Sequence, residues 1–326
     1  MRSNAGRMLM LATVSGAVMG LALLVGATGD GPGMLRAALA DPASPEAVIL
    51  FDLRLPRVLL AFVVGSALGL CGAALQALVR NPLADPYLLG LSGGAGLGAV
   101  AAIALEPAAT WAVPLAAFVG ALGAITLVFR LSVVASRRLD PRVLVLAGVV
   151  VGSFAAALMS ALITLAPATQ LRNAFLWLLG GFGSASWQAL GLFVVYAVLP
   201  TLLLLAQARR LDLFVLGDEP AQALGADIER TKRVVYFAAS LLTAAAVAVS
   251  GIIGFVGLVV PHAMRRIVGP LHLVLLPATM LVSGAFLVLA DALARTAVRP
   301  MELPVGVVTA LVGVPVFALL LRRGLR

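Results

Sequence analysis

Long uninterrupted apolar runs are the feature that most constrains this chain. Several of them, such as residues 57–79, extend for about 20 residues, the length that an α-helix needs to cross the ~30 Å hydrocarbon core of a bilayer. Hydrophobic residues make up 62% of the chain and charged residues 11%, whereas a water-soluble domain carries about 25% charge. The runs lack the alternation of apolar and polar residues that membrane β-strands show. The sequence therefore predicts an all-α integral membrane protein.

About ten transmembrane helices are expected in one transmembrane domain covering residues 1–326. The first follows Arg2 and Arg7, and we interpret it as a retained helix because its apolar run exceeds the usual core of a cleaved signal. The eighth is too short for a simple crossing. The predicted spans are 8–28, 57–79, 88–105, 111–131, 143–166, 188–208, 233–253, 255–268, 271–291 and 305–322.

The basic residues favour one orientation of these ten crossings. With the N-terminus in the cytoplasm, most of the 23 Lys and Arg residues fall in cytoplasmic segments, as the positive-inside rule requires. The net charge of +9 is therefore interpreted as membrane topology, and no nucleic-acid partner is expected. The termini are predicted to be cytoplasmic, and the basic residues left outside are Arg36, Arg54, Arg57, Arg172, Arg295 and Arg299.

Several classes of site lack the residues that they need. Cys71 is the only cysteine and the chain has two histidines, so a metal site has few ligands available and none is expected. The only lysine, Lys232, does not lie in a phosphate-binding loop, so the chain cannot be a P-loop ATPase by itself. Asp291 is the only acid near a late span, which disfavours proton coupling. No catalytic residue is expected, and energy must enter from another subunit.

Three stretches do not have the pattern of a simple crossing. Residues 209–233 are polar, and the start signal at Gly217–Pro220 predicts a short helix outside the bilayer that ends near Gly225. Residues 167–187, with two tryptophans and three glycines, predict an interfacial helix and turn. Residues 250–266 predict a broken or short helix, with a motif made of Gly254, Gly257, Pro261 and His262. A structural role for His262 is favoured over metal ligation.

Five segments together resemble the permease subunits of type II ABC importers, the family that takes up ferric siderophores, haem and cobalamin. They occur in the family's order from about residue 50 to the C-terminus. The segments are LRLPR at 53–57, NPLADP at 81–86, SGIIGFVGLVVPHAMRR at 250–266, LADALAR at 289–295 and ELPVGVVTALVGVPVF at 302–317.

The resemblance implies a set of partners. Permeases of this family form homodimers of ten-helix subunits in the bacterial inner membrane. They bind two cytoplasmic ATPase subunits, which carry ATP and Mg, and receive cargo from a periplasmic or lipid-anchored binding protein. No cofactor is expected on this chain itself.

The resemblance also assigns roles to individual residues. Arg54, Arg57 and Arg295 match the arginines that pair with glutamates on the binding protein; the alternative is that they anchor helix ends at the membrane interface. Asn81 and Leu83 match a cytoplasmic gate, unless Asn81-Pro82 is only a turn.

Two further assignments follow the same resemblance. The second gate position holds Asp140 and Pro141 where the family often has small hydroxyl residues, which leaves its chemistry open. Residues 218–230 match the helix that couples to the ATPase, against a solvated loop as the alternative. The coupling residues are Asp218, Glu219, Ala223, Leu224 and Gly225.

The expected function is therefore import of a bulky iron chelate or tetrapyrrole by alternating access, driven by ATP on a partner. No residue in the sequence decides which cargo is carried. Haem is slightly favoured over a ferric siderophore or cobalamin only because of the resemblance to the family. A wide, mainly apolar cavity is expected. The alternative is a secondary transporter or channel that works alone.

Overall fold

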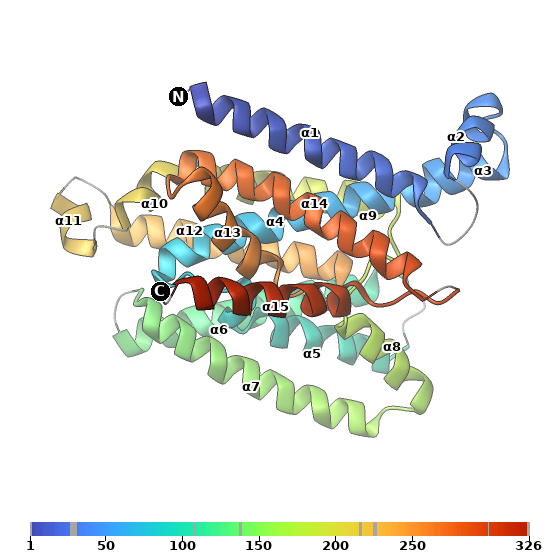
Figure 1. Cartoon of the computed structure of the whole chain (residues 1–326). Helices are drawn as coiled ribbons and strands as arrows, with labels where there is room; N and C mark the ends of the chain where they lie inside the picture. The colour runs from blue at the N-terminus through green and yellow to red at the C-terminus, as the bar shows by residue number, and fades with distance from the viewer. Residues whose placement is uncertain are drawn as a thin grey trace.

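The computed structural model describes residues 2–26, 31–106, 109–136, 139–214, 217–223, 227–298 and 300–324. These residues form a bundle of helices whose long axes run in roughly one direction (Figure 1). Within them, the β-structure consists of one isolated bridge between Val298 and Met301. The predicted all-α fold is confirmed.

Each of the ten predicted spans coincides with a helix. These ten are α1 (Arg2–Leu24), α4 (Leu55–Val79), α5 (Leu91–Ala104), α6 (Ala112–Ser136), α7 (Pro141–Leu165), α9 (Trp187–Ala206), α12 (Ile228–Ser250), α13 (Val256–Val268), α14 (His272–Thr296) and α15 (Val305–Gly324). Seven helices among the described residues are long and apolar enough to cross a membrane, while the apolar helices Leu91–Ala104 and Val305–Leu319 are shorter.

The remaining helices are short, and most of them lie at the ends of the bundle. They are α2 (Gly31–Ala40), α3 (Pro45–Ala47), the π-helix η1 (Val48–Arg54), the 3-10 helix η2 (Pro86–Leu89), α8 (Ala168–Leu178), α10 (Ala208–Phe214) and α11 (Asp218–Ala223). We call the end that carries α2 and α3 the α2 end, and the opposite end, with α10 and α11, the α11 end. The start of α1 and the end of α15 both lie at the α11 end (Figure 1).

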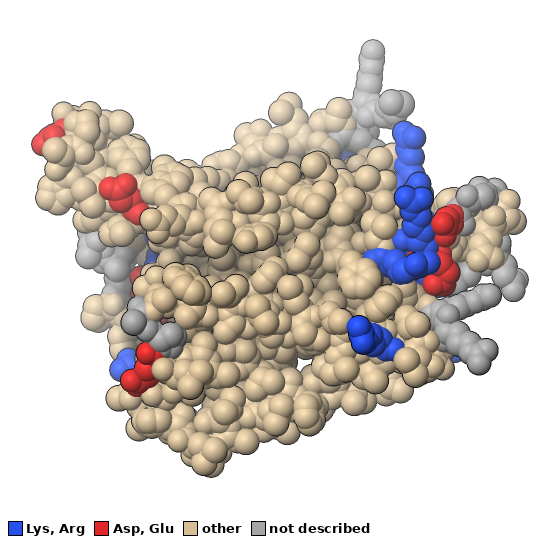
Figure 2. All heavy atoms as spheres, turned by 180° about the vertical axis from the view of Figure 1, so that it is seen from behind, with Lys and Arg blue, Asp and Glu red and all other residues tan. Residues whose placement is uncertain are grey.

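Charged side chains gather at these two ends. The face shown in Figure 2 is a broad uncharged belt, with acidic residues mainly at the α2 end and basic residues mainly at the α11 end. The belt exposes many large apolar side chains, among them Leu146, Phe154, Val195 and Leu199. Exposed apolar residues on this scale are stable only in contact with lipid or another protein.

The centre of the bundle is α4, which packs against α9, α12, α13 and α14. Its side chains Leu60, Val64, Leu68 and Leu75 are almost fully buried. Close packing is possible because Gly65 and Gly69 face α14 and Gly72 faces α13, and a side chain at any of the three would meet the neighbouring helix.

The break before α13 appears where the sequence predicts it, but α12 ends three residues before the predicted residue 253. Gly251 adopts a φ of 66°, a left-handed conformation that glycine tolerates, and this ends α12 at Ser250. A side chain on Gly251 would also meet the carbonyl oxygen of Trp177. At the other end, the Asp227 carboxylate accepts a hydrogen bond from Arg230 N and caps α12.

Candidate functional site

Arg57 lies in a charged cluster at the α2 end. Its Nη2 atom is 2.9 Å from Asp291 Oδ1 on α14 and 2.9 Å from Glu302 Oε2, which precedes α15. Arg295 Nε lies 3.0 Å from Asp291 Oδ2, an ion-pair contact without hydrogen-bond geometry. Asp291 is only 1% exposed, so it is a buried anion that compensates two guanidinium groups.

Arg54 and Arg295 hold the end of α1. Arg54 Nη1 donates to Leu23 O at 3.1 Å, and Arg295 donates to Val25 O at 3.2 Å and to Ala22 O at 3.3 Å. The carbonyls of Ala22 and Leu23 belong to the last turn of α1 and that of Val25 follows it directly. The last carbonyls of a helix lack intrahelical donors. Cations are also favourable at the C-terminus of a helix. Both arginines therefore stabilise the position of α1.

The three predicted docking arginines thus lie together, but they are not freely accessible in the single subunit. Arg54 and Arg295 are buried, and most of the Arg57 side chain is covered. A glutamate from a binding protein would have to displace Glu302 from Arg57 or the end of α1 from the other two. Docking through them stays a prediction, and Glu302, which is 42% exposed, is a participant that the sequence did not single out.

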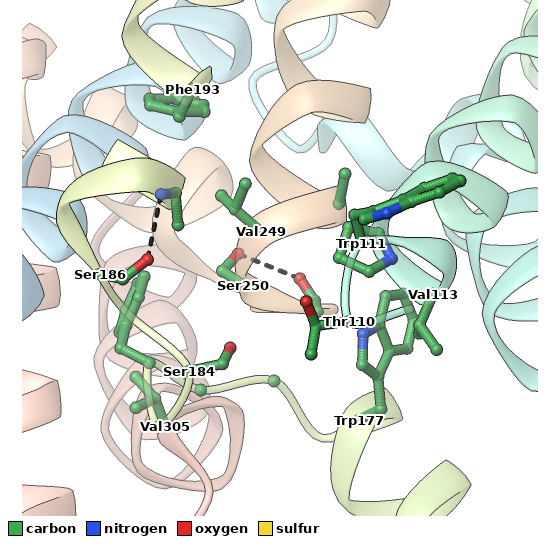
Figure 3. Close-up of a pocket in the computed structure, with 18 of the residues that line it drawn as sticks. Thr110, Trp111, Val113, Trp177, Ser184, Ser186, Phe193, Val249, Ser250 and Val305 are labelled. Atoms are coloured by element: carbon green, nitrogen blue, oxygen red, sulfur yellow. Dashed lines mark hydrogen bonds between the residues drawn. The ribbon is translucent and has the colours of Figure 1, made fainter. Parts of the chain in front are cut away.

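A cavity of about 940 Å³ opens near this cluster, between α6, α8, α9, α12 and the segment before α15. Figure 3 shows Trp111 and Trp177 on the α6 and α8 side and Ser186 and Phe193 on the α9 side. Its size is at the upper end of small-molecule pockets, and its apolar walls with a few polar groups are typical of them. Arg57 and Glu302 also line it. The aromatic lining residues are Trp111, Phe118, Trp177, Phe182, Phe193 and Tyr196.

The predicted gate residues Asn81 and Leu83 lie in the turn after α4, at the α11 end. Asn81 Oδ1 accepts from Leu83 N at 2.9 Å, and both side chains are exposed. The turn leads to Asp85, which accepts from Tyr87 N at 2.9 Å and caps η2. Burial raises the pKa of Asp85 to about 6, although that hydrogen bond opposes the shift.

The second predicted gate position is the start of α7. Asp140 accepts from Arg142 N at 2.8 Å as the N-cap, and Pro141 is the first residue of the helix. These are the preferred residue types for a helix start. The structure therefore gives this pair a local structural role, and its part in a gate stays a prediction.

Gln76 joins the first gate turn to α13. Its side-chain nitrogen donates to Ala84 O at 3.3 Å and to Gly257 O at 3.2 Å. Arg265 of α13 donates to the side-chain oxygen of Gln76 and to Ala73 O. Gln76 was not predicted from the sequence, although it is a lone amide in the apolar run of α4 and was therefore an available signal.

The four residues of the short-helix motif differ in how closely the rest of the protein packs around them. Gly257 packs against Leu68 O of α4, whereas a side chain on Gly254 would meet open space. Pro261 is buried inside α13, and His262 is partly exposed. Within the described residues, no group of three His, Cys, Asp or Glu side chains has the arrangement of a metal site.

The short helix predicted to begin at Gly217–Pro220 is present as α11, Asp218–Ala223, and its predicted end near Gly225 falls outside the described residues. Its role in coupling stays a prediction. Ala223 is exposed and Ala221 is fully buried. For Asp218 and Glu219 the structure describes the helical backbone only, and Leu224 and Gly225 lie outside the described residues. A second short helix, α10, precedes α11 in this polar segment and was not predicted from the sequence.

The sequence matches the FecCD transport family over residues 12–323. The chain belongs to this family. As a FecCD permease, it is 44% identical over 276 residues to a cobalamin import system permease protein, BtuC, of Halobacterium salinarum, covering 84% of this chain and 73% of that protein. It is 44% identical over 281 residues to the hemin transport system permease protein HmuU of Yersinia pestis, covering 84% and 83%.

The fold gives the same result. A solved structure described as an inward-facing conformation of a candidate metal-chelate type ABC transporter matches this FecCD permease with a TM-score of 0.88 and 31% identity. The match covers 98% of this chain and 99% of the other. The identification as a multi-pass permease of the ABC importer family is therefore confirmed.

Proposed function

We propose that this permease imports a bulky iron chelate or tetrapyrrole through the bacterial inner membrane, driven by ATP on a separate ATPase. The observation that carries the proposal is the match of nearly the whole fold to a metal-chelate type transporter, together with relatives named for hemin and cobalamin. Haem remains slightly favoured. The chain's lack of a phosphate-binding loop supports an ATPase on another subunit.

In this proposal the α2 end faces the periplasm, and the α11 end with both termini faces the cytoplasm. The concentration of basic residues at the α11 end supports this orientation (Figure 2). The arginine cluster then meets the binding protein, and α11 within segment 209–233 meets the ATPase. Residues 1–326 act as one transmembrane domain, and two copies form the dimer.

The cavity at the α2 end is proposed to receive the cargo. Its aromatic walls can stack on a planar macrocycle, and its few hydroxyl groups hold cargo weakly enough for release. Alternating access then requires this cavity to close while the turn at Asn81 and Leu83 opens, because only differential binding to two states moves cargo in one direction.

Filling the cavity tests this assignment. Val249 of α12 lines it, so Val249→Trp is expected to reduce haem uptake at least about tenfold by occupying the volume that the ligand needs. The matched control is Val195→Trp on α9, whose side chain is 73% exposed and does not line the cavity. Uptake into proteoliposomes that contain the whole importer is the measurement. Equal uptake by both variants would remove the cavity from the pathway.

The proposed assembly is tested by native mass spectrometry of the permease co-expressed with the ATPase from the same gene neighbourhood. Two permease and two ATPase subunits are expected, with the ATPase lost when residues 218–223 are replaced by a glycine and serine linker. A monomeric permease, or ATPase binding that survives this replacement, would contradict the proposed partners.

A further inference from the structure

Asp212 and His272 form a joint between the coupling segment and the membrane helices. Asp212 lies on α10, directly before α11, and His272 is the first residue of α14. Asp212 Oδ1 accepts from His272 N at 2.9 Å and lies 2.6 Å from His272 Nδ1. One carboxylate oxygen therefore contacts both the backbone and the ring of the same residue.

This contact supplies the cap that α14 lacks in its own sequence. The N-cap residue Leu271 has no side-chain hydrogen bond to offer, and the first amides of a helix need an acceptor. A carboxylate at this position also interacts favourably with the helix dipole. The His272 ring is buried, and its Nε2 atom has no hydrogen-bond partner among the described residues. The ring is therefore held through Nδ1 alone.

Each side of this contact is also packed against neighbouring helices. On one side, Leu211 and Phe214 of α10 are buried, and α10 packs against both α14 and α11. On the other side, Leu275 of α14 packs with Met264 and Val268 of α13 in a separate buried cluster. Contacts from α10 therefore continue to the start of α14 and to the end of α13.

From α13, the displacement has a polar route to the gate turn. Arg265 on the same helix donates to Gln76, and Gln76 donates to Ala84 O, next to Leu83. A continuous series of contacts therefore leads from α11 through α10, α14 and α13 to the turn after α4.

We infer that the contact of Asp212 with His272 transmits movement of the coupling helix to α13, α14 and the cytoplasmic gate. This inference rests on the proposed ATPase coupling at α11. It makes Asp212 and His272 positioning residues, because neither lies in the cargo cavity or on α11 itself. Contact alone does not establish coupling, so the test must measure movement on both sides of the joint.

Spin labels provide that measurement without any cargo. In a Cys71→Ser background, labels are placed at Gln222 on α11 in one sample and at Ile267 on α13 in another; both positions are exposed. Distances between the two copies in the complete complex are recorded without nucleotide and with ATP and vanadate. In the parent protein both distances should change. In Asp212→Ala, the nucleotide-dependent distance change between the Gln222 labels should persist. The change between the Ile267 labels should fall below half of its value in the parent protein.

Two further variants keep the result interpretable. Asp212→Asn retains an oxygen acceptor for His272 N and should fall between parent and Asp212→Ala, which guards against a folding defect in the alanine variant. Ser15→Ala removes a different hydrogen bond to α14, from Ser15 Oγ to Leu281 O, and should leave both changes intact. An undiminished change at Ile267 in both Asp212 variants would overturn the inference. If the parent shows no change at Gln222, the proposed ATPase coupling fails, and the inference fails with it.

Discussion

Replacing Asp291 with alanine is expected to prevent the permease from accumulating in a folded state. The carboxylate is 1% exposed and pairs with Arg57 and Arg295, so its removal leaves two guanidinium groups without their shared anion. Breaking a buried pair by removing one partner costs about 3–5 kcal/mol, which is a large part of the stability of a protein domain. The measurement is the yield of monodisperse protein in fluorescence-detected gel filtration.

Glu302→Gln is the matched control for this prediction. Glu302 contacts the same Arg57 guanidinium but is 42% exposed, and exposed ion pairs contribute about 0–1 kcal/mol. Its yield should match the parent protein. If Asp291→Ala gave the same yield as Glu302→Gln, the charged cluster would not hold α4 to α14 as described.

Gly72→Ala is expected to separate α4 from α13 and to destabilise the bundle. The added methyl group would overlap the carbonyl group of Gly257, which is backbone and cannot rotate away. Overpacking of this kind typically costs about 1–3 kcal/mol. Because the same two helices frame the Gln76 contacts, uptake should also fall. Thermal unfolding in detergent measures the stability change.

Gly191→Ala on α9 is the matched control, and it is not expected to destabilise the protein. A side chain at Gly191 meets nothing within 4 Å, and alanine is favoured over glycine in a helix interior by about 1 kcal/mol. The unfolding temperature of Gly191→Ala should therefore be equal to or above that of the parent. A Gly72→Ala protein as stable as Gly191→Ala would show that α4 and α13 are not in close contact.

The ten helices could be predicted because lipid imposes a length and a composition on every crossing segment. The short helix α13 was predictable because its apolar run is too short to cross a membrane and contains Pro261. The helix begins after Gly251, in agreement with the glycines at the start of this segment. The C-terminal end of α12 could not be predicted, because it depends on the contact of Gly251 with Trp177, more than 70 residues away in sequence.

The surroundings of the candidate site residues were less predictable. The sequence placed Arg54, Arg57 and Arg295 at one end of the bundle, but their burial depends on where α1 ends and on how Asp291 faces α4. The contact between Asp212 and His272 could not be predicted from the sequence either. The two residues are 60 positions apart and meet only because α10 packs on α14.

ATP-dependent uptake is the most direct test of the proposed function. The permease is reconstituted into proteoliposomes with the ATPase inside and the binding protein outside, and haem, cobalamin and a ferric siderophore are supplied separately. One of the three cargoes should accumulate only when ATP and the ATPase are both present, and a proton ionophore should leave the rate unchanged. Accumulation by the permease alone in response to a proton gradient would contradict the proposal and favour a secondary transporter.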